Sequence, residues 1–175
     1  MIKIDSLIKI LEKNHINFFT GVPDSILKQL SIYLQKKNKK QHIVASNEGA
    51  AISIGIGHYL STKKIPCIYM QNSGLSNALN PLISIANKKV YSIPLILIIG
   101  WRGSPHIKDE PQHNVKGKIT LDLLKLLNIK YTIIRKISDL VKFNKKIKNA
   151  KKNKTIVACL IEQGILKKNK KIEIK

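Results

Sequence analysis

The stretch Asn47-Glu48-Gly49-Ala50-Ala51 decides the fold, because it joins a predicted strand to a predicted apolar helix. We expect the strand over 42–46 and the helix over 47–60, where small and aliphatic side chains predominate. Asn47 is a typical N-cap residue, and an acid in the first turn is favoured by the positive end of the helix dipole. Glu48 therefore has a structural interpretation as a capping acid. A functional interpretation depends on what the rest of the chain places beside it.

Length and composition indicate one domain with an aliphatic core. The chain has 175 residues, of which 43% are hydrophobic and only 5% aromatic. The longest apolar run, 93–100, has the length of a strand and is too short to span a membrane. The N-terminus carries no long apolar segment, which argues against a signal peptide. Cys67 and Cys159 fall in predicted buried strands, so we expect free thiols in a cytoplasmic protein without a membrane partner.

The formal net charge of +22 raises the possibility of nucleic-acid binding. Arg102 and Arg135, however, are the only arginines among 32 basic residues, and arginine is the usual reader of phosphates and base edges. The lysines gather at positions expected to face solvent, as in 36–40, 145–154 and 167–175. This pattern is typical of a compositional bias towards lysine, and we expect no nucleic-acid partner.

Predicted strands alternate with predicted helices along the whole chain. This order is typical of a three-layer α/β/α fold, in which a mostly parallel sheet is covered by helices on both faces. We assign 1–166 to this domain, 167–175 to a basic C-terminal tail and 101–118 to a long loop. The expected strands are 17–20, 42–46, 65–70, 93–100, 131–134 and 155–161, and the expected helices are 5–14, a helix opened by Pro23, 47–60, 75–86, 120–127 and 138–149.

Four turns follow strands of this predicted sheet, at 21–25, 47–48, 71–74 and 101–113. In such folds, ligands bind beyond the carboxyl ends of the strands, so we expect the turns to form one site. Gly55 and Gly57 lie within a helix and make a poor dinucleotide fingerprint, and no nucleophile elbow or metal-ligand spacing is present. The few ionisable residues in the turns suit a half-site that needs a cofactor or a second chain.

Six ordered blocks resemble the N-terminal half of the phosphonopyruvate decarboxylases, which belong to the thiamine-diphosphate-dependent decarboxylases. The related sulfopyruvate decarboxylases are similar in the first three blocks. The resemblance is close over about 18–117 and looser elsewhere. The blocks are Gly21-Val22-Pro23-Asp24-Ser25, Asn47-Glu48-Gly49-Ala50-Ala51, Met70-Gln71-Asn72-Ser73-Gly74, Asn80-Pro81-Leu82, Ile99-Gly100-Trp101-Arg102-Gly103 and Lys108-Asp109-Glu110-Pro111-Gln112-His113.

The resemblance implies a pyrimidine-binding domain that uses thiamine diphosphate and Mg²⁺. In this family a separate domain binds the diphosphate and the metal through a Gly-Asp-Gly block, and this sequence has no such block. The resemblance thus implies a partner, a beta subunit with the diphosphate-binding domain, in a hetero-oligomer. A fragment of a longer enzyme is the alternative. Met1 and the lysine-rich end after a last strand lead us to expect a natural subunit.

Residues are assigned roles where they match the family blocks. Glu48 matches the glutamate that activates the cofactor through the pyrimidine ring. Asn72, Ser73 and Gly74 match the turn that approaches the cofactor, where a glycine lets the backbone come close. The structural interpretation of Gly74 is a turn at the start of a helix. No residue of this chain is expected to bind the metal.

The remaining assignments concern the substrate. Asp24 resembles an acid near the substrate, or else is a first-turn helix acid. His113 resembles a histidine used for proton transfer, or else is a solvated loop residue. Arg102 is predicted to bind the substrate phosphonate in a bidentate way, with Ser25 and Lys108 as further substrate ligands.

The sequence therefore predicts the pyrimidine-binding subunit of a carboxy-lyase that converts phosphonopyruvate to phosphonoacetaldehyde and CO2. The chain alone is expected to be inactive. A sulfopyruvate decarboxylase alpha subunit differs only in its substrate, and the block around Arg102 discriminates the two. A non-catalytic regulatory domain of the same fold is the alternative from a different class. In that case, Glu48→Gln would leave the activity of any associated enzyme unchanged.

Overall fold

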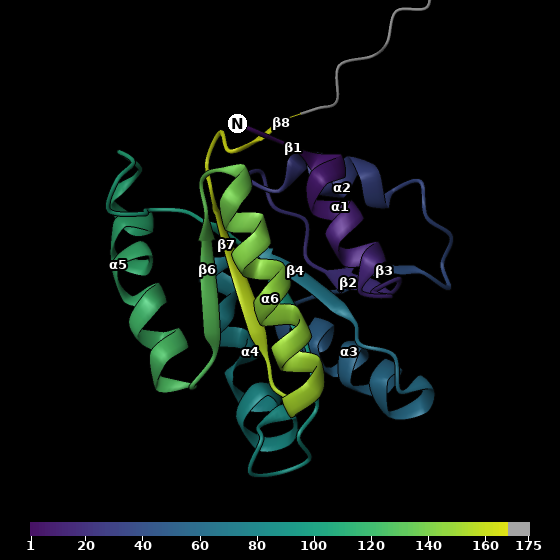
Figure 1. Cartoon of the computed structure of the whole chain (residues 1–175). Helices are drawn as coiled ribbons and strands as arrows, with labels where there is room; N and C mark the ends of the chain where they lie inside the picture. Colours follow the sequence, from purple (N-terminus) through teal and green to yellow (C-terminus); the bar gives the residue numbers. More distant parts are fainter. Residues whose placement is uncertain (168–175) are drawn as a thin grey trace, which may run out of the picture.

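A six-stranded parallel sheet forms the centre of the molecule, in the order β3-β2-β4-β5-β7-β6. The computed structural model describes residues 1–167, and Figure 1 shows the sheet with its helices. The order places β4 and β5 at the middle and β3 and β6 at the edges. The strands are β2 (Phe19–Gly21), β3 (His42–Val44), β4 (Cys67–Gln71), β5 (Ile96–Trp101), β6 (Lys130–Ile134) and β7 (Val157–Glu162).

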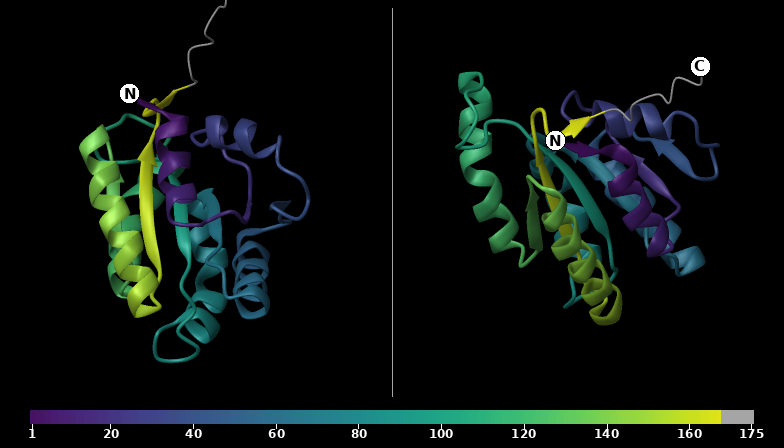
Figure 2. Two further views of the ribbon diagram at one scale, coloured as in Figure 1. Left: turned by 45° about the vertical axis from the view of Figure 1, so that its right-hand side comes forward. Right: turned by 45° about the horizontal axis from the view of Figure 1, so that its top comes forward.

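Helices cover both faces of the sheet, which confirms the predicted three layers. Helices α1, α2 and α6 pack on one face, and α3, α4 and α5 pack on the other, as the views in Figure 2 allow the reader to follow. A short π-helical turn, η2 (Leu82–Ala86), continues α4. The helices are α1 (Ile4–Lys13), α2 (Lys28–Leu34), α3 (Glu48–Thr62), α4 (Leu75–Pro81), α5 (Pro111–Leu126) and α6 (Ile137–Asn153), and the 3-10 turn η1 (Asn72–Gly74) precedes α4.

The central strands are apolar on both sides because each side faces a helical layer. In β4, Cys67 and Tyr69 contribute to the core beneath α1, α2 and α6, whereas Ile68 and Met70 contribute to the core beneath α3, α4 and α5. Cys159 of β7 joins the first of these cores, and both cysteines are buried free thiols, as expected. The alternation of side chains along a strand thus divides one apolar run between two cores.

The segment after β5 differs from the prediction of a loop over 101–118. Trp101 is the last residue of β5, and α5 begins at Pro111, nine residues before the predicted helix. Proline suits the first turn of a helix because it has no N–H to leave unbonded there. Gly117 lies inside this helix, where its backbone packs on Gly103. The position requires a glycine because a Cβ atom there would overlap the Gly103 carbonyl. His113 is therefore a helical residue.

The second helix begins later than predicted. Pro23 does not open it, because Asp24 and Ser25 form turns first and α2 starts at Lys28. The Asp24 carboxylate accepts a hydrogen bond from the Leu27 N–H at 3.2 Å, and the Ser25 carbonyl accepts one from the Lys28 N–H. A local hydrogen bond to a side chain, such as that of Asp24, competes with the hydrogen bonds of a helix. Asp24 is consequently held in a turn above the sheet.

A second, two-stranded sheet near the N-terminus escaped the sequence analysis. It pairs β1 (Ile2–Lys3) with β8 (Leu166–Lys167) in parallel. Two-residue strands carry too little periodicity to be recognised in a sequence. Lys167 therefore belongs to β8, and the rest of the predicted basic tail, 168–175, lies outside the described residues. Within 1–167, none of the helices combines the length and the apolar character that crossing a membrane requires.

Candidate functional site

The turns after β2, β3, β4 and β5 meet at the carboxyl edge of the sheet, which confirms their predicted convergence. The Glu48 carboxylate lies against Gly74, and the Asp24 carboxylate lies against Gly100. The Asn72 side chain is hydrogen-bonded to the backbone of Arg102. These contacts join segments far apart in the sequence, because the strands that precede them are neighbours in the sheet.

Glu48 is fixed by the start of α3 and by the backbone opposite. Asn47 caps the helix, since its side-chain oxygen accepts the Ala50 N–H at 2.9 Å. One Glu48 carboxylate oxygen, Oε2, accepts a hydrogen bond of 3.0 Å from Asn77 Nδ2 on α4. The other oxygen lies against Gly74, where any Cβ atom would overlap the carboxylate. Gly74 thus makes room for the acid itself, and Asn77 orients it.

Asn72 ties the end of β5 to the turn after β4. Its side-chain oxygen accepts the Arg102 N–H at 3.1 Å, and its amide nitrogen donates to the Arg102 carbonyl at 3.0 Å and to Thr120 Oγ1 at 2.9 Å. The residue is 4% exposed. The Asn72 amide is therefore used in hydrogen bonds within the protein. This gives Asn72 a structural role in addition to its predicted role in cofactor binding.

Arg102 is held at its side chain as well as its backbone. Its Nε and Nη2 donate to the Asp109 carboxylate at 2.9 and 2.7 Å in a fork, and Asp109 also accepts the backbone N–H groups of Gly103 and Glu110. The Arg102 guanidinium holds the pKa of the Asp109 carboxyl well below its usual range, and the same hydrogen bonds raise the pKa of Arg102. The Nη1 group of Arg102 makes no hydrogen bond within residues 1–167.

Asp24 is an almost buried acid with one unbonded oxygen. Its Oδ2 accepts the Leu27 N–H, whereas its Oδ1 is buried and has no partner among the described residues. Burial raises the pKa of Asp24, and the N–H groups of Ile26 and Leu27 and the charge of Arg102 offset only part of that rise. A carboxyl with a raised pKa at this edge of the sheet is a candidate for proton exchange with a ligand.

The other predicted site residues are more open. Ser73 is half-buried and its Oγ accepts Gln71 Nε2 at 2.9 Å, while Ser25 and Lys108 are exposed. His113 is half-buried in the first turn of α5, where its N–H donates to the Glu110 carbonyl. The described part of the chain gives the side chains of Ser25, Lys108 and His113 no hydrogen bond. The structure brings these residues to the same edge of the sheet, and their roles stay predictions.

Sequence reasoning missed two residues that arrange the site, Asn77 and Asp109. Asn77 lies three residues after Gly74, a spacing that puts both on one side of a helix, and this signal could have found it. The sequence gives Asp109 no role beyond its place in the last of the six blocks. Its hydrogen bonds to Arg102, which lies seven residues earlier in the chain, close a loop whose shape no periodicity reveals. The same loop is anchored to β7, because the Glu162 carboxylate accepts hydrogen bonds from Ser104 and from Arg135.

The family model for the N-terminal TPP binding domain of thiamine pyrophosphate enzymes matches residues 4–126. This chain belongs to the thiamine pyrophosphate enzyme family. The matched range includes all four turns of the site, and so the predicted resemblance is confirmed. It ends with α5 and leaves β6, α6 and β7 outside.

Two sets of relatives within the family are similar to this chain. Phosphonopyruvate decarboxylase of Streptomyces viridochromogenes is 37% identical over 119 residues, which cover 68% of this chain and 29% of that protein. Sulfopyruvate decarboxylase subunit alpha of Methanococcus maripaludis is 35% identical over 127 residues, which cover 73% of this chain and 74% of that subunit. The chain thus spans under a third of the first relative and most of the second.

Solved structures of the family share the fold. Benzoylformate decarboxylase from Polynucleobacter necessarius superimposes with a TM-score of 0.68 at 17% sequence identity, over 91% of this chain and 29% of that one. At this identity the likeness concerns the fold alone. It supports the three-layer architecture derived above from the packing of the helices.

Proposed function

We propose that this chain is the pyrimidine-binding subunit of a thiamine-diphosphate-dependent decarboxylase that converts phosphonopyruvate to phosphonoacetaldehyde and CO2, a step of phosphonate biosynthesis in the cytoplasm. A second subunit would carry the diphosphate- and Mg²⁺-binding domain, in a hetero-oligomer. The family match and the phosphonopyruvate decarboxylase relatives support this proposal.

The observation that carries the proposal is the arrangement of Glu48. One carboxylate oxygen is oriented by Asn77, and the other lies over Gly74 with no hydrogen bond within residues 1–167. A carboxylate fixed in this way can hold a proton at a ring nitrogen of an aminopyrimidine. Half-burial beside the Ala51 and Ile52 core strengthens such a bond, because water competes for it less. The residues present therefore fit the pyrimidine end of thiamine diphosphate.

The bound cofactor would supply the electron sink for loss of CO2 from a 2-oxo acid. The residues of this chain would handle the substrate around it. Asp24, whose pKa is raised by burial, would exchange a proton with the substrate, with His113 as a second proton carrier. Arg102 would meet the phosphonate with its Nη1 group, because Asp109 already holds its Nε and Nη2. Ser25 and Lys108 would complete the binding of the anionic substrate.

A sulfopyruvate decarboxylase alpha subunit is the second candidate function, and the lengths of the proteins favour it. The Methanococcus maripaludis relative is itself named as a subunit, and the match covers about three quarters of both chains. The blocks at Arg102 and Asp109 favour phosphonopyruvate. Both candidates share the reaction type, the cofactor and the need for a partner.

The test is to co-express the chain with the product of the neighbouring gene. Aldehyde formation from phosphonopyruvate and from sulfopyruvate would be measured with thiamine diphosphate and Mg²⁺. We expect activity that needs both chains, prefers phosphonopyruvate and collapses in Glu48→Gln. Glu12→Gln on α1, whose acid bonds only to Tyr33 in the described chain, is the matched control and should retain activity. Activity that survives Glu48→Gln would instead indicate a regulatory domain.

A further inference from the structure

Adjoining cavities open at the amino edge of the sheet, opposite the candidate site. Two of them have volumes of about 350 and 570 Å³ and share Lys88, Asn128, Thr155 and Ile156 in their linings. A third shares Asn128 with both, and Lys130 and Lys146 with the larger one. We call the hollow lined by these six residues the amino-edge groove. It lies between the end of α5, the segment after η2 and the second half of α6.

The groove has a strongly positive and uncompensated lining. Lys88, Lys130 and Lys146 reach it from three different segments, and no acidic side chain lines any of the three cavities. Asp122, on α5, is already bonded to Lys125 at 2.8 Å. Most other acids of the described chain follow the carboxyl ends of the strands, at the opposite edge: Asp24, Glu48, Asp109, Glu110, Asp139 and Glu162.

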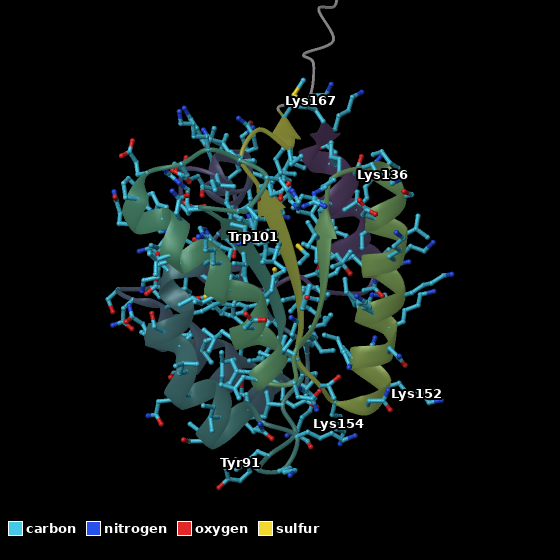
Figure 3. The ribbon with its side chains drawn as sticks, turned by 90° about the vertical axis from the view of Figure 1, so that its left-hand side faces the viewer. Tyr91, Trp101, Lys136, Lys152, Lys154 and Lys167 are labelled. Atoms are coloured by element: carbon cyan, nitrogen blue, oxygen red, sulfur yellow. The ribbon has the colours of Figure 1, made fainter. Side chains whose placement is uncertain are left out.

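Lysines at this edge have an ordinary explanation where they end helices. Lys125, Lys151 and Lys152 lie in the last turns of α5 and α6, where a cation offsets the negative end of the helix dipole. Figure 3 shows Lys152 and Lys154 at this end of the molecule, far from Lys136 and Lys167. The explanation does not extend to the groove lysines. Lys88 lies in a loop, Lys130 begins β6, and Lys146 lies about two turns before the end of α6.

Lys146 shows that the positive charge in the groove is not neutralised. Its ammonium group donates to the Tyr131 carbonyl, and it is only half-exposed. Burial lowers the pKa of Lys146, and the nearby charges of Lys130 and Lys142 lower it further. An anion placed between Lys130 and Lys146 would relieve this repulsion.

We propose that the amino-edge groove binds a small oligophosphate anion. Ammonium groups bind phosphate oxygens as point charges, and the amides of Asn128 and Asn149 and the Thr155 hydroxyl add neutral donors. The volumes lie in the range of small-ligand pockets. The only aromatic side chain in the linings is Tyr131, so stacking on a base contributes little. This site is independent of the proposed decarboxylase function.

The test is calorimetric titration of the full chain with inorganic triphosphate, ATP and adenosine. We expect saturable binding of triphosphate and ATP at low salt and none of adenosine. Lys146→Gln and Lys130→Gln should each weaken triphosphate binding about tenfold, which corresponds to the loss of one charged contact. Lys145→Gln removes the same charge from a neighbouring position of α6 that does not line the groove, and it should bind like wild type.

Three outcomes would show that the groove does not recognise the phosphates of the ligand. Equal weakening by Lys145→Gln and Lys146→Gln would overturn the proposal, and so would the absence of saturable triphosphate binding. Binding of ATP and adenosine without triphosphate would also overturn it, because the nucleoside would then be the recognised group. Since Lys130→Gln removes no hydrogen bond made within residues 1–167, it tests the groove even if Lys146→Gln folds poorly.

Discussion

Replacing Asp109 by alanine tests whether the loop after β5 is a rigid part of the site. The Asp109 carboxylate accepts two hydrogen bonds from Arg102 and one each from the N–H groups of Gly103 and Glu110. Removing one partner of a buried ion pair costs about 3–5 kcal/mol of unfolding free energy. The side chain of Arg102 is 23% exposed and that of Asp109 6%, so water can solvate part of the freed guanidinium. We therefore expect the lower end, about 3 kcal/mol.

The loss would be measured by urea denaturation and by thermal melting of the purified chain. For a protein of this size, 1 kcal/mol corresponds to about 2–4 °C, so the melting temperature should fall by about 6–12 °C. Asp122→Ala is the matched control, because Asp122 pairs with Lys125 at the surface, where both side chains are more than 60% exposed. It should unfold like wild type.

The pH dependence of the unfolding free energy gives a second test of the ion pair between Arg102 and Asp109. Because the folded pKa of Asp109 is lowered, its stabilisation is present above the unfolded pKa of about 4 and is lost as the pH falls below that value. The difference between Asp109→Ala and wild type should therefore shrink in acid. If Asp109→Ala loses less than about 1 kcal/mol of unfolding free energy at neutral pH, or no more than Asp122→Ala loses, the reasoning is refuted.

Two further predictions concern Asp24 and Gly74. Because burial raises the folded pKa of Asp24, its stabilising contribution is complete below the unfolded pKa and is lost as the pH rises through the folded value. Asp24→Asn keeps an oxygen for the Leu27 N–H, and it should raise the unfolding free energy at neutral pH and leave it unchanged near pH 3. Urea denaturation at both pH values measures this difference. Equal stability of the variant and the wild type at neutral pH would count against it. Gly74→Ala should displace the Glu48 carboxylate and weaken thiamine-diphosphate binding by the assembled enzyme, whereas Gly57→Ala, which points into open space on α3, should not. If titrations show the two glycine variants binding cofactor equally, Gly74 does not position the acid.

Much of the fold follows from local patterns in the sequence. The apolar run that became β5 and the apolar repeat of α3 are signals carried by neighbouring residues, and their alternation predicts a parallel sheet. The carboxyl-edge location of Glu48 and Asp24 follows from that topology. The predictions from sequence were wrong where a local signal is compatible with two structures. Pro111 and Gly117 favour a loop in the sequence, although a first-turn proline and a tightly packed glycine both suit a helix.

The chain's sequence by itself determined the family, the layers and the edge where the site lies, because ordered blocks and periodicity are properties of neighbouring residues. Only the tertiary structure decided how the side chains at that edge are used. Asn72 and Arg102 are thirty residues apart in the chain and become partners because β4 and β5 are adjacent. The amino-edge groove likewise exists only where segments distant in sequence meet. Contacts of this kind depend on the order of strands and the packing of helices, which no local pattern encodes.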